Sequence, residues 1–206
     1  MRIVFATGNM GKMREIREIM ADFNIDIVSM KEAGVETDVE EDGTTFMENS
    51  FIKARAISKI CHEKGYEDIV LADDSGLVVD ALNGEPGIYS ARYMGEDTPY
   101  SIKNANIIER LEGVPDDKRS ARFVCAIACV MPDGEELQAE ATYEGAIGYE
   151  EKGEHGFGYD PIFLVPELGV TTAQLSPDEK NGISHRGRAL RAMAECLKEE
   201  MSKYAC

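Results

Sequence analysis

Two adjacent aspartates, Asp73 and Asp74, stand between two apolar segments near the middle of the chain. Residues 69–72 and 77–79 are each short enough to be a buried strand, and Ser75 with a glycine completes the link between them. Two carboxylates at the end of a buried strand repel each other and lose solvation unless a cation compensates them. Mg²⁺ takes such oxygen ligands, often together with substrate phosphates. The alternative is an ordinary turn, because Asp, Ser and Gly are common in turns.

A glycine-containing loop near the N-terminus, TGNMGK at residues 7–12, is the second candidate. It follows a predicted strand at residues 2–6 and precedes a predicted helix in which apolar residues recur at helical spacing from Met13 to Met20. Such a loop directs backbone amides and a helix N-terminus at a phosphate, and Lys12 adds a positive charge. It differs from a Walker A loop in its glycine spacing and in the residue after the lysine. A tight strand-to-helix turn remains the alternative.

Three further segments carry residues suited to binding a charged ligand. An acidic segment with Glu40 and Glu41 precedes a predicted helix at residues 46–62, and a loop at 153–163 combines three glycines with aromatic residues. A basic segment at 184–188 opens the last predicted helix, where cations are disfavoured unless an anion or acceptor is present. The alternatives to ligand binding are, for the three segments in turn, a solvated acidic loop, aromatic side chains packed under a sheet, and a hydrated basic turn.

The remaining sequence alternates between strand and helix patterns, as expected for an α/β fold. A strand is predicted at 25–30, a helix from an N-cap at Thr98 to Gly113, and a helical turn from Ser176. Two long strands at 119–130 and 136–149 are joined by Pro-Asp-Gly, which predicts an antiparallel hairpin.

Composition limits the class of protein. The chain has 206 residues, of which 43% are hydrophobic, so it can bury a sizeable core without disulfides. Its formal charge of −17 argues against a nucleic-acid polymer as partner, although it allows a small anion bound through local cations and a metal. Five cysteines without a CxxC pair predict reduced thiols packed in the core, with Cys206 in a frayed tail. The absence of a signal-like or membrane-spanning apolar run predicts a soluble cytoplasmic protein with no membrane contact.

Five stretches of the chain resemble, in the same order, the motifs of the inosine triphosphate pyrophosphatase family. They are TGNMGK at 7–12, EEDGTTFMENS at 40–50, LADDSGLVVDALNGEPGIYSARY at 71–93, FGYDPIF at 157–163 and SHRGRAL at 184–190. The resemblance implies a mixed, elongated central sheet with flanking helices, in which two lobes of one domain, residues 1–206, surround a deep active-site cleft. It also implies a homodimer and the Mg²⁺-dependent hydrolysis of noncanonical purine nucleoside triphosphates (ITP, dITP and XTP) to the monophosphate and pyrophosphate.

The resemblance further implies roles for individual residues. Mg²⁺ would be held by Glu40 or Glu41 with Asp73 and Asp74, and Asp74 would be the base that activates water. The phosphates would contact Thr7, Gly8, Asn9, Met10, Gly11, Lys12 and Lys53, and Ser75 would touch the substrate. Phe157, Gly158, Tyr159 and Asp160 would line the base and sugar pocket, and Lys180, His185 and Arg186 would complete the purine end. Donors from His185 and Arg186 would suit the O6 acceptor of hypoxanthine and xanthine better than the amino group of adenine.

Two other functions remain open at the level of sequence. A regulatory nucleotide-binding module would keep the phosphate loop but would gain little from clustered carboxylates. A metal-dependent hydrolase of another phosphorylated metabolite would keep both features but would show no preference for purine bases.

Overall fold

The computed structural model describes residues 2–21 and 25–203, and in these residues seven strands form one mixed sheet in the order β2-β1-β3-β4-β5-β6-β7. The strands are β1 (Ile3–Phe5), β2 (Ile27–Ser29), β3 (Ile69–Val79), β4 (Ser120–Val130), β5 (Glu136–Ile147), β6 (Phe163–Val165) and β7 (Val170–Thr171). The longer helices are α1 (Met10–Ile19), α2 (Phe46–Glu63), α3 (Tyr100–Arg110), α4 (Pro177–Ile183) and α5 (His185–Lys203). Strand β1 pairs in parallel with β2 and β3, whereas β6 pairs antiparallel with β5 and β7. The predicted mixed α/β sheet with flanking helices is confirmed.

The chain divides into two compact units. The first unit comprises Met1–Asp74, Cys125–Ala141 and Arg186–Cys206, and the second comprises Ser75–Val124 and Thr142–His185. The chain therefore passes from one unit to the other within β3, β4 and β5, and again at the start of α5.

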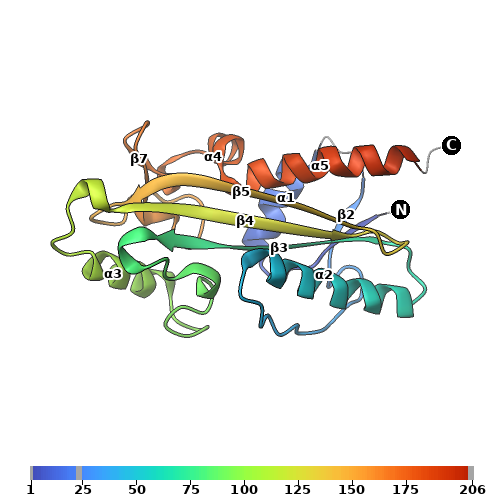
Figure 1. The fold of residues 1–206 in the computed structure, drawn as a ribbon. Helices are drawn as coiled ribbons and strands as arrows, with labels where there is room; N and C mark the ends of the chain where they lie inside the picture. The colour runs from blue at the N-terminus through green and yellow to red at the C-terminus, as the bar shows by residue number, and fades with distance from the viewer. Residues whose placement is uncertain (1, 22–24, 204–206) are drawn as a thin grey trace. The chain divides into compact units, whose positions relative to one another are not determined.

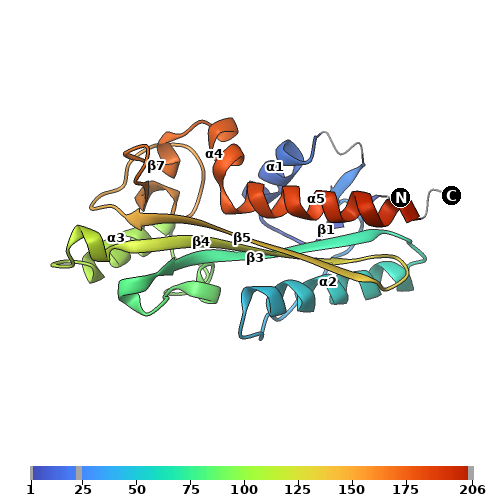
Figure 2. The same ribbon diagram turned by 45° about the horizontal axis from the view of Figure 1, so that its top comes forward.

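In the first unit, helices cover both faces of the sheet (Figures 1 and 2), with α1 and α5 on one side and α2 on the other. Alternate residues of β1 and β3 serve the two faces, as the period of two along a strand requires. Phe5 and Leu71 pack in the cluster that includes α1 and α5, whereas Val4 and Val70 pack with Ile57 of α2. Burial of both faces explains why β1 and residues 69–72 of β3 are continuously apolar.

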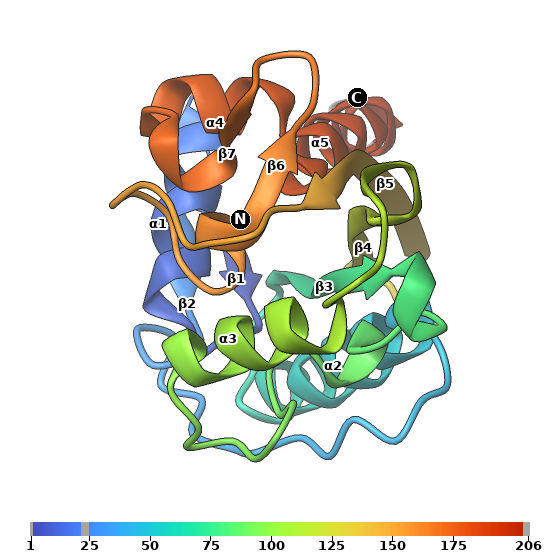
Figure 3. The same ribbon diagram turned by 90° about the vertical axis from the view of Figure 1, so that its left-hand side faces the viewer.

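The second unit has one apolar core. Leu77 and Val79 of β3 pack there with Ile107 of α3 and with Phe163 of β6. Figure 3 shows α3 on one side of the end of β3, with β6, β7 and α4 on the other side. Phe123 of β4 and Tyr143 of β5 belong to the same cluster.

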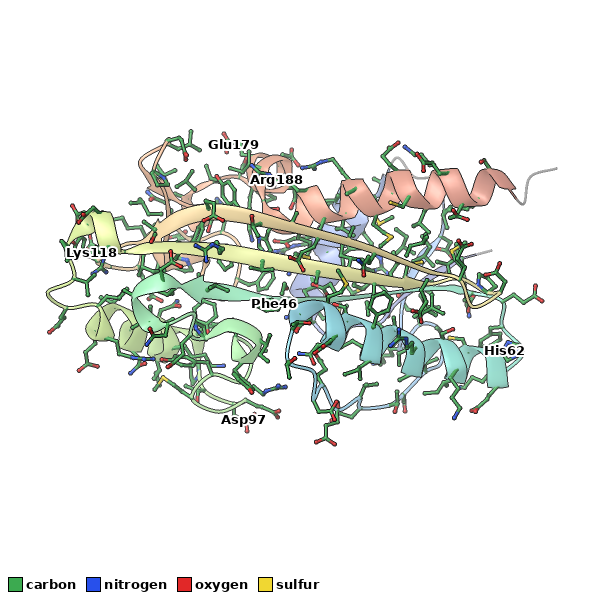
Figure 4. All side chains as sticks on the ribbon, viewed as in Figure 1. Phe46, His62, Asp97, Lys118, Glu179 and Arg188 are labelled. Atoms are coloured by element: carbon green, nitrogen blue, oxygen red, sulfur yellow. The ribbon has the colours of Figure 1, made fainter. Side chains whose placement is uncertain are left out.

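Local signals account for most helix boundaries. The side chain of Thr45 accepts a hydrogen bond from the amide of Glu48 and caps α2. Figure 4 labels Phe46, the first residue of this helix, and His62, which lies one residue before its end. Ser176 and Glu179 form a reciprocal capping box at the start of α4. Helix α3 begins at Tyr100, and its N-cap is Pro99, so the predicted cap at Thr98 lies one residue too early.

The Asp-Asp-Ser-Gly segment was expected to link two strands, and this expectation is wrong, because β3 continues through it from Ile69 to Val79. Within each unit, a serine hydroxyl takes up a backbone amide of this strand. Ser50 Oγ accepts from the amide of Asp74 at 2.7 Å, and Ser90 Oγ accepts from the amide of Leu77 at 2.9 Å. These tertiary hydrogen bonds outweigh the local preference of Asp, Ser and Gly for turns.

The other predicted strands and helices are confirmed within one or two residues at most ends, including the hairpin, where the amide of Met131 donates to the carbonyl of Glu135 at 2.8 Å. Cys61, Cys125 and Cys129 are buried and carry free thiols, whereas Cys206 lies outside the described residues. Across residues 2–21 and 25–203, no helix has both the length and the apolar character needed to cross a bilayer.

Candidate active site

The TGNMGK segment forms the junction between β1 and α1, and Met10 to Lys12 are the first turn of the helix. Asn9 is the N-cap, and its Oδ1 accepts hydrogen bonds from the amides of Gly11 at 2.9 Å and Lys12 at 3.1 Å. The amide of Asn9 donates to Thr7 Oγ1. The segment therefore has the predicted form of a strand, a loop and a helix N-terminus, which is a suitable place for an anion. A phosphate that contacted the amides of Gly11 and Lys12 would have to displace the Asn9 side chain.

Asp73 is completely buried in a cluster of charged side chains of the first unit. Its Oδ2 lies 2.9 Å from Lys12 Nζ and 3.4 Å from Arg186 Nε, and Arg186 also donates to the carboxylate of Glu15. Burial alone raises the pKa of Asp73, but the charges of Lys12 and Arg186 hold it well below its ordinary value. Asp73 is therefore an ionised partner of two cations.

Asp74 has a different environment from Asp73, although the two residues are adjacent. Its side chain is 8% exposed, and Oδ2 accepts a hydrogen bond from Asn49 Nδ2 at 3.0 Å. Burial raises the pKa of Asp74 to about 6; the charge of Glu41 adds to this effect, while the Asn49 hydrogen bond and Lys12 oppose it. A carboxylate of this basicity is mostly ionised at neutral pH and is suited to accept a proton from water.

The acidic segment contributes one half-buried carboxylate to this part of the first unit. Glu41 Oε1 lies 2.9 Å from Lys53 Nζ, and the same nitrogen donates to the backbone carbonyl of Asp73 at 3.3 Å. Glu40, in contrast, is exposed. The two glutamates that the sequence could not separate thus differ in burial and in contacts.

Asp74 and Glu41 are the carboxylates of the first unit that could hold Mg²⁺. Within the described ranges, no three His, Cys, Asp or Glu side chains gather into a ready metal site. Asp74 and Glu41 are close enough for the charge of Glu41 to raise the pKa of Asp74, and a divalent cation would relieve this repulsion. Because Mg²⁺ binds through one or two carboxylates plus substrate phosphates, these two residues fit that ion.

In the second unit, Asp160 organises the glycine and aromatic loop. Its carboxylate accepts hydrogen bonds from the amide of Phe157 at 2.8 Å, from Thr172 Oγ1 at 2.9 Å and from Lys180 Nζ at 2.6 Å. Gly156 has a φ of +75°, and a Cβ there would lie 2.2 Å from Asp160 Oδ2. The loop conformation therefore depends on this buried carboxylate and on the glycine beside it.

The aromatic residues of that loop have different environments. Phe157 is half-buried, with Lys180 Nζ 5.0 Å from its ring centroid. Tyr159 is buried, meets Tyr100 edge-on at 5.2 Å, and donates to the carbonyl of Ser90 at 2.8 Å. Tyr159 thus packs in the core, while Phe157 keeps an exposed surface that a planar base could contact.

The structure groups the predicted site residues unit by unit. The first unit contains Lys12, Glu41, Lys53, Asp73, Asp74 and Arg186. The second unit contains Ser75, Phe157, Gly158, Tyr159, Asp160, Lys180 and His185. The adjacent residues His185 and Arg186 therefore belong to different units. His185 is buried against Phe123, with the ring centroids 4.8 Å apart, whereas Arg186 joins Asp73 and Glu15. Arg186 was expected at the purine end, whereas in the structure its guanidinium contacts the carboxylates of Asp73 and Glu15.

Sequence reasoning missed two residues that contact predicted ones, namely Glu15 and Thr172, and it gave no role to Asn49 of the EEDGTTFMENS motif. Helical spacing was an available signal for Glu15, which lies three residues after Lys12 on α1. Asn49 lies one turn before Lys53 on α2, but that spacing does not reveal its contact with Asp74. No local signal pointed to Thr172, which reaches Asp160 through the fold of the second unit.

Comparison with known proteins gives consistent results. The dITP/XTP pyrophosphatase of Clostridium perfringens is 52% identical over 198 residues, which cover 96% of this chain and 97% of that protein. The dITP/XTP pyrophosphatase of Escherichia coli O157:H7 is 45% identical over 96% of this chain and 98% of its own length. The structure is similar to that of a HAM1 protein from Coxiella burnetii, with a TM-score of 0.84, 42% identity and coverage of 97% of this chain and 99% of the other.

The structure of the Staphylococcus aureus Ham1 protein has a TM-score of 0.83 and 42% identity, and it covers 97% of this chain and 100% of its own. The model of the Ham1 family matches residues 3–196. These findings confirm the resemblance inferred from the five motifs, and the chain belongs to the Ham1 family.

Proposed function

We propose that this protein hydrolyses the noncanonical purine nucleoside triphosphates dITP, ITP and XTP to the corresponding monophosphate and pyrophosphate. The observation that carries the proposal is the cluster of the first unit, in which the ionised Asp73 pairs with Lys12 beside the more basic Asp74. Relatives of up to 52% identity named dITP/XTP pyrophosphatase support it.

In this reaction, Asp74 accepts a proton from a water molecule. The water oxygen forms a bond to the α-phosphorus as the bond from that phosphorus to the oxygen bridging to the β-phosphate breaks, and pyrophosphate leaves. Lys12 and Lys53 lie near Asp74 and stabilise negative charge on the phosphate oxygens. The first turn of α1 adds its helix dipole to the same task.

Mg²⁺ would be held by Asp74 and Glu41 together with phosphate oxygens, and when bound it withdraws negative charge from the reacting phosphate. Of the two glutamates, Glu41 is the better candidate because it is half-buried and contacts Lys53, whereas Glu40 is exposed. Asp73 was first expected to be a metal ligand. We assign it instead to balancing the positive charges of Lys12 and Arg186, which its carboxylate contacts.

The residues of the second unit are assigned to the purine base. The half-buried ring of Phe157 offers a stacking surface, and Asp160 holds both the loop amide and Lys180 in place. His185 supplies a donor for the O6 acceptor of hypoxanthine or xanthine. The contacts of Arg186 with Asp73 and Glu15 favour a supporting role near the phosphates over direct contact with the base.

The assembly and location that the family resemblance implies are a homodimer in the cytoplasm, and we keep both as proposals. Light scattering coupled to size exclusion would measure the mass in solution; a monomer at micromolar concentration would refute the dimer.

The proposed activity is tested by pyrophosphate release from ITP, XTP, dITP, ATP and GTP, with and without Mg²⁺. We expect metal-dependent release confined mainly to the first three nucleotides. Release from all five at equal rates would refute the assigned base preference. Silence from folded protein, with nucleotide binding intact, would indicate a regulatory binding module instead.

A further inference from the structure

Asn49 lies in the first turn of α2 and is completely buried in the first unit. We propose that Asn49 is a positioning residue for hydrolysis, which holds the Asp74 carboxylate and the acidic segment in one fixed arrangement. The inference rests on the proposed function and extends it to a residue without a charge.

The two ends of the Asn49 amide bind two different segments. Nδ2 donates to Asp74 Oδ2 at 3.0 Å, while Oδ1 accepts from the amide of Gly43 at 2.9 Å. Gly43 is two residues after Glu41, the proposed metal ligand. One short and buried side chain therefore connects the proposed base with the segment that carries the proposed ligand.

The surroundings of Asn49 leave it little freedom. Thr44 donates to Glu48 Oε2 through both its amide and its hydroxyl, at 2.7 Å each, which fixes the approach to the helix. A Cβ at Gly43 would lie 2.7 Å from Asn49 Oδ1 and 2.9 Å from Glu48 Cβ, so the close approach requires glycine. The side-chain amide of Asn49 is thus held between the first turn of α2 and a segment that can come this close only with glycine at position 43.

The residue after Asn49 holds the main chain of Asp74. Ser50 Oγ accepts from the amide of Asp74 at 2.7 Å and donates to the carbonyl of Ala126 at 2.8 Å. Consecutive residues of α2 therefore fix both the backbone and the carboxylate of Asp74. A carboxylate held at both points loses little free energy to reorientation when it takes a proton from water.

Asparagine is the residue type that this arrangement needs. An aspartate at position 49 could still accept from the Gly43 amide, but it would turn a second acceptor toward Asp74 in a buried site. The repulsion would push the two carboxylates apart. A serine would be too short to bridge Gly43 and Asp74 but would add no charge.

The test uses Asn49→Asp and Asn49→Ser, with Arg55→Gln as a matched control. Arg55 lies on the same helix, is exposed, and pairs with Glu136 away from Asp74. We expect kcat on ITP to fall about 100-fold in both Asn49 variants, as displacement of a catalytic group by about 1 Å can do. Affinity for a non-hydrolysable ITP analogue should change by less than about threefold, because only the transition state loses stabilisation. Circular dichroism establishes that each variant is folded.

A double-mutant cycle separates positioning from a purely structural role. If Asn49 acts through Asp74, then adding Asn49→Asp to Asp74→Asn should lower kcat by less than about threefold further, because the effects of coupled residues do not add. The double variant, Asn49→Asp with Asp74→Asn, again has one amide facing one carboxylate. Its thermal unfolding midpoint should therefore be higher than that of Asn49→Asp alone.

Four results would overturn the inference. Near-normal kcat in folded Asn49→Asp and Asn49→Ser would remove Asn49 from positioning while leaving the proposed function intact. A full further 100-fold loss in the Asp74→Asn background, or equal losses of kcat and affinity, would show that Asn49 does not act through Asp74. Wild-type protein without pyrophosphatase activity would instead refute the proposed function, and the inference with it.

Discussion

The adjacent aspartates should respond in opposite ways to the same substitution. Asp74→Asn is expected to stabilise the protein at pH 7, because the pKa of Asp74 is raised from 3.8 to about 6 by burial, which means that its charged form is disfavoured in the folded state. The difference corresponds to an upper limit of about 3 kcal/mol at about 1.4 kcal/mol per pKa unit. Asp73→Asn should destabilise by about 3–5 kcal/mol, because it removes the buried partner of Lys12 and Arg186.

The pH dependence distinguishes this origin from a packing effect. For an acid whose folded pKa is raised, stability is fully present below the unfolded pKa and is lost as the pH rises through the folded pKa. The stabilising effect of Asp74→Asn should therefore be absent below about pH 4, should grow up to about pH 6, and should stay constant above it. Activity should fall by orders of magnitude throughout, since asparagine cannot accept the proton.

Urea denaturation of wild type, Asp73→Asn and Asp74→Asn between pH 4 and 8, in metal-free buffer, measures these effects. The midpoint differences are compared at unchanged slope, so that a change in the exposed surface is recognised. An Asp74→Asn variant that is no more stable than wild type at pH 7, or equally stabilised at pH 4, would refute the assignment of Asp74 as a carboxylate that burial makes more basic. Stability losses of equal size in both variants would refute the contrast between the two sites.

Two further predictions concern the second unit. Arg119→Met should cost about 3–5 kcal/mol, because the buried guanidinium donates at 2.8 Å to three backbone carbonyls that would lose their partner. Arg122→Met removes surface ion pairs on β4, the strand that begins one residue after Arg119, and it should cost less than about 1 kcal/mol in the same urea assay. Gly156→Ala should weaken binding of a non-hydrolysable ITP analogue more than tenfold, because the new Cβ would lie 2.2 Å from Asp160 Oδ2. The control Gly113→Ala, also at positive φ but in open space, should bind the analogue normally. Equal affinities of the two variants in calorimetry would count against a role of the loop in binding.

Local patterns were sufficient to predict the helices. Apolar spacing located α1 and the serine cap located α4, because a helix forms from contacts between residues three and four apart. The same local reasoning was wrong for the segment from Asp73 to Gly76, where turn-favouring residues lie inside β3. Hydroxyl groups from Ser50 and Ser90, both distant in the chain, satisfy the amides of this strand.

The sequence by itself determined the alternating strands and helices, the acidic pair, the loop with Lys12 and membership in a nucleotide-hydrolysing family. Only the tertiary structure decided which of two adjacent carboxylates is held ionised by cations and which is made more basic by burial. The reason is physical: a pKa depends on solvent exclusion and on charges close in space, and Arg186 reaches Asp73 from 113 residues away in the chain. For the same reason, only the structure shows that the neutral Asn49 contacts Asp74 and Gly43.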